Sequence, residues 1–321
     1  MPVYLQADTT QFMIENSHEA ALHEIRSDIE SVRSNALLYQ QGNFSARAEA
    51  LHFIDFHILD HIESIIPQVS QTDELLLLRQ EAGKIKAALE EIDNQLFEKL
   101  RAAIQTGAYK TRGFKRLIEE FTDLDLNQTK QEEIGYDNLD VLMNGLLPAL
   151  AMPGQVRALE AEMVYYQKTP ARFVFELVEK ARFSNGDVFF DVGSGLGQVA
   201  MLVNLLAGIK VKGIEFEPAF CSYASEVAAV LNLPDVDFIN IDAREADYSA
   251  GMVFFMYTPF KGNMLLEVLE RLKQESALRK ITVITYGPCT PEVALQAWLI
   301  PTGTIDGSIY KLAVFISREP G

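Results

Sequence analysis

Residues 188–199 read Val-Phe-Phe-Asp-Val-Gly-Ser-Gly-Leu-Gly-Gln-Val, and an apolar helical pattern continues to Leu206. This order predicts a buried strand, a glycine-rich turn and a helix. Glycines at alternate positions allow a tight turn and a close approach of the backbone to a ligand, while the N–H groups of the helix start point into the same space. The spacing differs from the G-x-G-x-x-G fingerprint of dinucleotide-binding proteins. Asp191, just before the glycines, favours a ligand with a cationic amino group over a pyrophosphate.

Length and composition are those of a soluble globular protein with two domains. The 321 residues are 48% hydrophobic and 23% charged, which is sufficient for two sizeable cores. The formal net charge is −17, and residues 1–150 carry 25 acids against 13 bases. No basic stripe is present that would release counterions from a phosphate backbone, so the sequence argues against nucleic acid as a partner.

The cysteines and the first residues indicate the compartment. Cys221 and Cys289 are too few for a disulfide framework or a cysteine-rich zinc site, and no metal is expected. Residues 1–8 lack the basic and apolar blocks of a signal peptide. No apolar stretch approaches the roughly 20 residues of a membrane span. The sequence therefore predicts a cytoplasmic protein that has no contact with a membrane.

Residues 1–150 are expected to form an all-α domain. Apolar residues recur there every three or four positions, between glycines and prolines that stop helices. The expected helices are Thr9–Gln41, Asn43–Ile66, Thr72–Gln105, Phe114–Phe121 and Leu139–Leu147. Three roles remain open for this domain: a cap over the active site, a contact that forms a homodimer, and a docking surface.

Residues 151–321 are expected to form an α/β domain. Short apolar strands alternate with helices, which indicates a parallel sheet with right-handed crossovers, and a late hairpin adds an antiparallel strand. The expected strands are Val188–Asp191, Val211–Glu215, Asp237–Ile241, Val253–Tyr257, Ile281–Tyr286 and Ser308–Ser317. The expected helices are Phe173–Ala181, Val199–Leu206, Ala219–Leu231 and Met264–Gln274. The chain is expected to end differently, with the segment Pro291–Leu299, a turn around Gly303–Gly307 and then the last strand.

Acidic residues stand at the ends of three consecutive predicted strands: Asp191, Glu215 and Asp242. Ligands of open α/β sheets bind beyond the carboxyl ends of the strands, so these side chains are expected to line one site. Glu215 follows Asp191 by 24 residues. A carboxylate at about that distance is placed to accept hydrogen bonds from ribose hydroxyls.

The glycine turn and the acids resemble the first motifs of class I S-adenosylmethionine-dependent methyltransferases, and a late hairpin is typical of that fold. More specifically, Val188–Val199, Gly213–Glu215 and Tyr166–Pro170 resemble the catalytic domain of the non-SET (Dot-one-like) histone lysine methyltransferases. This likeness covers roughly residues 155–290. It implies a Rossmann-like methyltransferase sheet preceded by the all-α domain, with S-adenosylmethionine as cofactor and S-adenosylhomocysteine as product.

The resemblance also implies roles for individual residues. Asp191 would hold the methionine amino group, Glu215 the ribose and Asp242 the adenine amine, with Phe216 beside the adenine ring. The residues expected to bind cofactor are Tyr166, Thr169, Asp191, Gly193, Ser194, Gly195, Gly197, Gln198, Glu215, Phe216, Asp242 and Ala243. Tyr166 and Thr169 are expected to cover the methionine end.

The fourth strand ends in Tyr257-Thr-Pro-Phe260, which resembles the [Asn/Asp]-Pro-Pro-[Tyr/Phe] motif of enzymes that methylate amino or amide nitrogens. Tyr257 and Thr258 replace its first two residues, and no basic nucleosome-binding tail is present. The acceptor is therefore left open between a protein lysine and a small molecule. The expected acceptor pocket is Tyr257, Thr258, Pro259, Phe260 and Tyr286, with Tyr257 as the candidate catalytic residue. A structural turn after a buried strand explains the same residues equally well.

Other interpretations compete with this one. A nicotinamide enzyme would show another glycine spacing, and an aminopropyl transferase an acid early in the fourth motif. His57 and His61 lie one helical turn apart near Asp60, as metal ligands can, but an amphipathic helix accounts for them. The leading function is methyl transfer to an unidentified acceptor by direct SN2 displacement. The alternative is a non-catalytic adaptor that retains a methyltransferase fold.

Overall fold

The computed structural model describes residues 4–69, 72–108, 111–122, 136–148, 150–305 and 307–319. Contacts along the chain divide it into two compact units. The first comprises Met1–Glu98 and Glu120–Asp123, and the second comprises Lys99–Glu119 and Leu124–Gly321. We call them the helical unit and the sheet unit. The domain boundary near residue 150 stays a prediction.

The helical unit consists of amphipathic helices, as the apolar periodicity predicts. Their bounds are α1 Tyr4–Ser34, α2 Phe44–Phe53, α3 Asp60–Ile65 and α4 Asp73–Gln105, of which the residues from Lys99 on belong to the sheet unit. The expected helix Asn43–Ile66 is interrupted by a π-helical segment, Ile54–Leu59. One buried apolar core is formed by α1, α3, α4 and this segment, and it includes Ile25, Ile29, Ile58, Ile62, Leu75 and Leu89, with partly buried residues of α2 packed against it.

One ion pair is buried inside the helical unit. The Arg47 Nε lies 2.7 Å from Asp93 Oδ1, and the Arg47 side chain is fully buried. The same guanidinium donates hydrogen bonds to the carbonyl oxygens of Leu38 at 3.1 Å and Gln40 at 2.8 Å. These bonds fasten the turn after α1 to α2 and α4, because a buried charge is tolerated only when it is paired and hydrogen-bonded.

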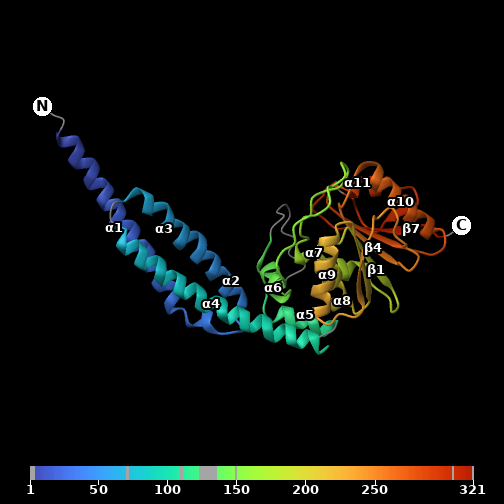
Figure 1. Cartoon of the computed structure of the whole chain (residues 1–321), viewed down its shortest axis with the longest axis horizontal. Helices are drawn as coiled ribbons and strands as arrows, with labels where there is room; N and C mark the ends of the chain where they lie inside the picture. Colours follow the sequence, from blue (N-terminus) through green and yellow to red (C-terminus); the bar gives the residue numbers. More distant parts are fainter. Residues whose placement is uncertain are drawn as a thin grey trace. The chain divides into compact units, whose positions relative to one another are not determined.

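The sheet unit contains a seven-stranded sheet in the order β3-β2-β1-β4-β5-β7-β6. Figure 1 labels its strands β1, β4 and β7. The first five strands pair in parallel, and β7 is antiparallel to both β5 and β6. This arrangement confirms the predicted Rossmann-like sheet with its terminal antiparallel hairpin. The strands are β1 Val188–Val192, β2 Lys210–Glu215, β3 Val236–Asn240, β4 Val253–Tyr257, β5 Thr282–Tyr286, β6 Leu299–Pro301 and β7 Ala313–Ser317. The helices are α5 Arg112–Glu119, α6 Asn138–Leu146, α7 Ala171–Ala181, α8 Gln198–Ala207, α9 Pro218–Val230, α10 Gly262–Ser276 and α11 Thr290–Ala294.

The sequence predicts no type of element for Pro291–Leu299. In the structure, helix α11 ends at Ala294, and the buried Leu299 begins the edge strand β6 and pairs with Ser317. The last strand starts at Ala313 rather than Ser308. Pro301 ends β6 after three residues, as expected for proline at a sheet edge.

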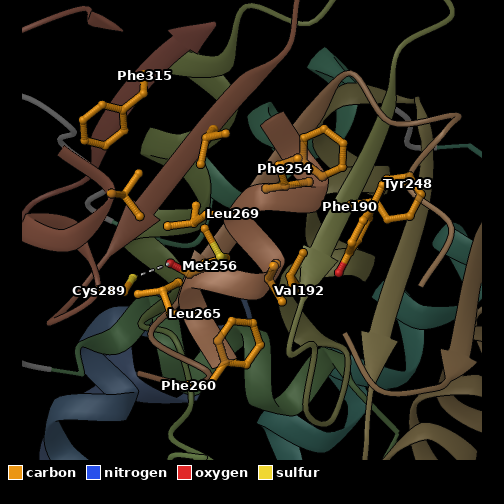
Figure 2. Packing of buried hydrophobic residues seen from close by; sticks show 14 of the residues in the cluster. Phe190, Val192, Tyr248, Phe254, Met256, Phe260, Leu265, Leu269, Cys289 and Phe315 are labelled. Atoms are coloured by element: carbon orange, nitrogen blue, oxygen red, sulfur yellow. Dashed lines mark hydrogen bonds between the residues drawn. The ribbon is translucent and has the colours of Figure 1, made fainter. Parts of the chain in front are cut away.

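Alternate residues of the central strands form a core on one face of the sheet. Phe190 and Val192 of β1 project to the same side as Phe254 and Met256 of β4, where α10 covers them (Figure 2). This layer fixes the central strands whose carboxyl ends carry the site described below. Among the residues that the structure describes, no helix has the length and apolar character needed to cross a membrane.

Candidate cofactor and methyl-acceptor site

The glycine turn after β1 has the conformation and the close contacts that require glycine. Gly193, Gly195 and Gly197 all have positive φ angles, of 81°, 53° and 81°. A Cβ atom on Gly195 would come within 2.3 Å of the Tyr166 ring, and one on Gly193 within 2.3 Å of the Pro259 Cβ. The turn therefore packs directly against two other predicted site segments, with no room for side chains.

The structure brings the predicted site residues together around one cavity of about 340 Å³ at the carboxyl ends of the strands. Eleven of the twelve expected cofactor-binding residues line it, namely Tyr166, Thr169, Asp191, Gly193, Ser194, Gly195, Gln198, Glu215, Phe216, Asp242 and Ala243. All five expected acceptor-pocket residues line it as well. Gly197 does not: it precedes α8, with Phe238 packed against it.

Several buried polar atoms in the cavity wall lack a hydrogen-bond partner among the described residues. They are Asp191 Oδ2, Ser194 Oγ, both terminal amide atoms of Gln198 and the Tyr286 hydroxyl. Buried polar groups are almost always hydrogen-bonded, so a cluster of unsatisfied ones indicates a site for a polar ligand. Donors and acceptors are both present, which suits a ligand with amino, carboxylate and hydroxyl groups.

Asp191 and Glu215 are neighbouring buried carboxylates in the wall of this cavity. Burial, and then the negative charge of Glu215, raise the pKa of Asp191 to about 7. Burial also raises the pKa of Glu215, against the effect of three backbone N–H donors, those of Glu217, Gly195 and Phe216. The N–H groups of Glu217 and Gly195 lie 2.8 Å and 2.7 Å from the Glu215 carboxylate. A cationic group bound between the two acids would relieve the cost of their ionisation.

Asp242 has a partner that the sequence did not indicate. Its two carboxylate oxygens accept hydrogen bonds from the Arg244 side chain at 3.0 Å and 2.6 Å, which hold the pKa of Asp242 below its ordinary value. Arg244 also donates to Glu160 at 2.9 Å. Asp242 Oδ1 also accepts from the Arg244 backbone N–H at 2.8 Å, so both of its lone pairs are used. Asp242 is therefore held in its ionised form at the cavity wall, and one lone pair of Oδ2 remains for a ligand amine.

The acceptor end of the cavity is aromatic. Tyr257 and Tyr286 are adjacent in the β4–β5 register, with ring centroids 4.8 Å apart. Burial raises the pKa of both phenols, so they stay protonated at neutral pH. Thr258 has a φ of 41°, and its hydroxyl donates to the Tyr286 carbonyl at 3.1 Å and accepts from the Cys289 N–H at 3.0 Å. Thr258 thus joins the two strand ends.

A segment that we call the strap (residues 155–167) lies along the cavity, and Tyr166 is its one residue that the sequence predicted for the site. Its residues Gln155, Leu159, Met163 and Tyr165 contribute to the lining, and so do Glu217 and Tyr310 elsewhere in the chain. The strap has no regular helix or strand, so it shows no hydrophobic periodicity. For Glu217 the sequence offered one signal, because an acid followed by a proline, here Pro218, is typical of the start of a helix.

His57, one of the two histidines that suggested a metal site, stacks on Phe53, with ring centroids 5.0 Å apart. The nearby His52 packs against Phe56, with ring centroids 4.4 Å apart. Among the described residues, no group of three or more His, Cys, Asp or Glu side chains could hold a metal ion.

The strand order, the glycine turn and the acids at the strand ends define a methyltransferase domain of class I. Residues 159–251 match the model of the family described as histone methylation protein DOT1. The resemblance expected from the sequence is thus confirmed over these residues, and with it the class of enzyme, an S-adenosylmethionine-dependent methyltransferase. Among curated proteins, none matches the chain.

Solved structures similar to this chain include an RNA methyltransferase from Salinibacter ruber in complex with S-adenosyl-L-homocysteine. It is 22% identical over 48% of this chain and 94% of its own, with a TM-score of 0.37. A SAM-dependent methyltransferase from Aquifex aeolicus is 20% identical over 46% of this chain and 93% of its own, with a TM-score of 0.38.

Proposed function

We propose that the cavity binds S-adenosylmethionine and that the protein transfers its methyl group to an acceptor held at the aromatic end. The observation that carries this proposal is the set of unsatisfied buried polar atoms on Asp191, Ser194 and Gln198, beside the glycine turn. Their positions fit the amino and carboxylate groups of a methionine moiety. The sulfonium of this cofactor supplies an activated methyl group with a good leaving group.

The residues of the site would bind and orient the cofactor. Asp191 accepts a hydrogen bond from the methionine amino group, Glu215 holds the ribose hydroxyls, and Asp242 accepts from the adenine amine. Tyr166 lies against Gly195 and covers the methionine end. Since the chemistry of the sulfonium needs no further activation, the protein contributes alignment and the exclusion of water.

The acceptor would enter beside Tyr257 and Tyr286. The five residues of the expected acceptor pocket that line the cavity, Tyr257, Thr258, Pro259, Phe260 and Tyr286, include no carboxylate, lysine, arginine or histidine. A protonated phenol is a hydrogen-bond partner and not a base, so Tyr257 would orient the nucleophile by its hydroxyl. An amine can be bound here against aromatic faces. A protein lysine and a small molecule are the two acceptor classes that we propose.

Methyl transfer can be measured directly. Purified protein is incubated with cofactor labelled in its methyl group and a cell lysate, and the lysate is then analysed for label in protein and in small molecules. We expect label in one acceptor class, and none with the Glu215→Ala variant. Absence of label with a protein that binds S-adenosylhomocysteine would favour the adaptor, the second candidate function, which the unusual Tyr-Thr-Pro-Phe motif suggests.

A further inference from the structure

The strap is held to the rest of the sheet unit by a few polar anchors. Because it forms no regular strand or helix, its backbone N–H groups need partners elsewhere in the protein. One such partner is the carboxylate of Glu217, which is 2% exposed. Its Oε2 atom accepts hydrogen bonds from the N–H groups of Val156 at 3.1 Å and Arg157 at 2.8 Å.

Glu217 also begins helix α9. Its other oxygen, Oε1, accepts from the Ala219 N–H at 3.1 Å, which caps the helix. One carboxylate therefore has two separable tasks: Oε1 caps α9 and Oε2 holds the strap. A hydrogen bond to a charged acceptor is stronger than one between neutral groups.

Arg157 reinforces this anchor from the strap side. Its guanidinium lies 4.8 Å from the centroid of the Phe216 ring and donates to the Phe216 carbonyl at 3.1 Å. Phe216 lines the cavity and is the residue expected beside adenine. The cation–π contact and the hydrogen bond fix the position of Phe216 and cover its outer face.

Glu217 is also hydrogen-bonded to Glu215, the residue proposed to hold the ribose. The Glu217 N–H donates to Glu215 Oε1 at 2.8 Å, and Glu215 Oε2 accepts from the Gly195 N–H at 2.7 Å. Hydrogen bonds thus link the strap to Glu217, Glu217 to Glu215, and Glu215 to the glycine turn. A separate hydrogen bond links Arg157 of the strap to Phe216.

We propose that Glu217 and Arg157 are positioning residues, whose contacts hold the strap over the nucleoside end of the cavity. These contacts, which we call the clasp, limit the rate at which the nucleoside dissociates. The proposal rests on the proposed function, because the nucleoside is that of the cofactor. Opening the clasp should therefore accelerate dissociation and leave association nearly unchanged.

The test compares three variants of the full chain. Glu217→Asp is one methylene shorter and is still a favourable helix cap, so it releases the strap and keeps α9 capped. Arg157→Leu removes the contact with Phe216, and Arg157→Lys is its matched control that retains a cation. Rates of S-adenosylhomocysteine binding and release are measured by stopped flow. Hydrogen exchange of the Val156 and Arg157 amides is measured without ligand.

We expect Glu217→Asp and Arg157→Leu to raise the dissociation rate at least tenfold with an association rate within twofold of the natural protein, and Arg157→Lys to have a smaller effect. Glu217→Asp should also lose amide protection at residues 156 and 157 while its melting temperature stays unchanged. Unchanged amide protection, or unchanged dissociation rates, would overturn the clasp. A third result is possible: the natural protein protects the amides of residues 156 and 157 but does not bind S-adenosylhomocysteine. That result would overturn the proposed function, and with it the role of the clasp in ligand release.

Discussion

Asp191 is a buried carboxylate whose ionisation is disfavoured by burial and by Glu215, which raises its pKa to about 7. Because the folded pKa lies above the unfolded value, the contribution of Asp191 to stability is present at acidic pH. It is lost as the pH rises through about 7. When the amino group of a ligand binds beside Asp191, the ionised form of its carboxylate is favoured over the protonated form.

We therefore predict that S-adenosylhomocysteine affinity rises between about pH 6 and pH 8, with uptake of ligand releasing a proton from Asp191. Calorimetry in buffers of different ionisation enthalpy measures the released proton. Asp191→Asn should bind more weakly and show a flat pH profile over this range. An equally steep profile in Asp191→Asn would show that another group titrates.

Gly195 provides a second prediction at the scale of a residue. A methyl group at this position would collide with the Tyr166 ring and would sit on a backbone with positive φ. Gly195→Ala should reduce S-adenosylhomocysteine affinity by at least tenfold, about 1.4 kcal/mol or more. The control is Gly83→Ala, in α4, where a Cβ atom has nothing within 4 Å. Calorimetric titration should find the control unchanged, and equal affinities for both variants would contradict the assigned role of the turn.

At the scale of the helices, we expect the stability of the helical unit to depend on the buried ion pair between Arg47 and Asp93. Arg47→Ala leaves the Asp93 carboxylate buried without its partner, which costs roughly 3–5 kcal/mol of unfolding free energy. Urea unfolding followed by circular dichroism measures the loss. Arg33→Ala is the matched control, because Arg33 forms exposed pairs with Glu30 and Glu81 and should lose less than about 1 kcal/mol. Similar losses in the two variants would refute the importance of burial.

The secondary structure that could be predicted is the part with strong periodicity. The stripe from Leu75 to Ile104 predicts α4, and the apolar run before Asp191 predicts β1, since both patterns reflect burial on a fixed face. The short strand β6 was missed because three residues ending in Pro301 carry no period. The π-helical segment Ile54–Leu59 was missed because its apolar spacing resembles that of an α-helix.

The lining of the cavity was predictable where one strand end carries its own motif, as at Asp191, Glu215 and Tyr257, whose roles in binding stay predictions. It was not predictable where distant segments meet. Arg244 pairs with Asp242 and Glu160, and Glu217 holds the strap across about sixty positions of sequence. Such contacts form only when the folded backbone brings distant residues together, so the spacing of residues along the sequence does not predict them.

At the scale of the whole molecule, ligand binding should stabilise the sheet unit, which contains the whole cavity. Trp298 is the single tryptophan and lies in that unit, so its fluorescence reports on the sheet unit. S-adenosylhomocysteine at a hundred times its dissociation constant should add about 2.7 kcal/mol to the stability measured there. A thermal or urea transition of Trp298 fluorescence that does not move on saturation with ligand would place binding elsewhere.

The central claim is that the cavity at the strand ends is a binding site for the methyl-donor cofactor. Calorimetric titration of the purified protein with S-adenosylhomocysteine tests it most directly. We predict one-to-one binding in the micromolar range, lost in Glu215→Ala. No binding by a protein whose circular dichroism shows it to be folded would contradict the claim.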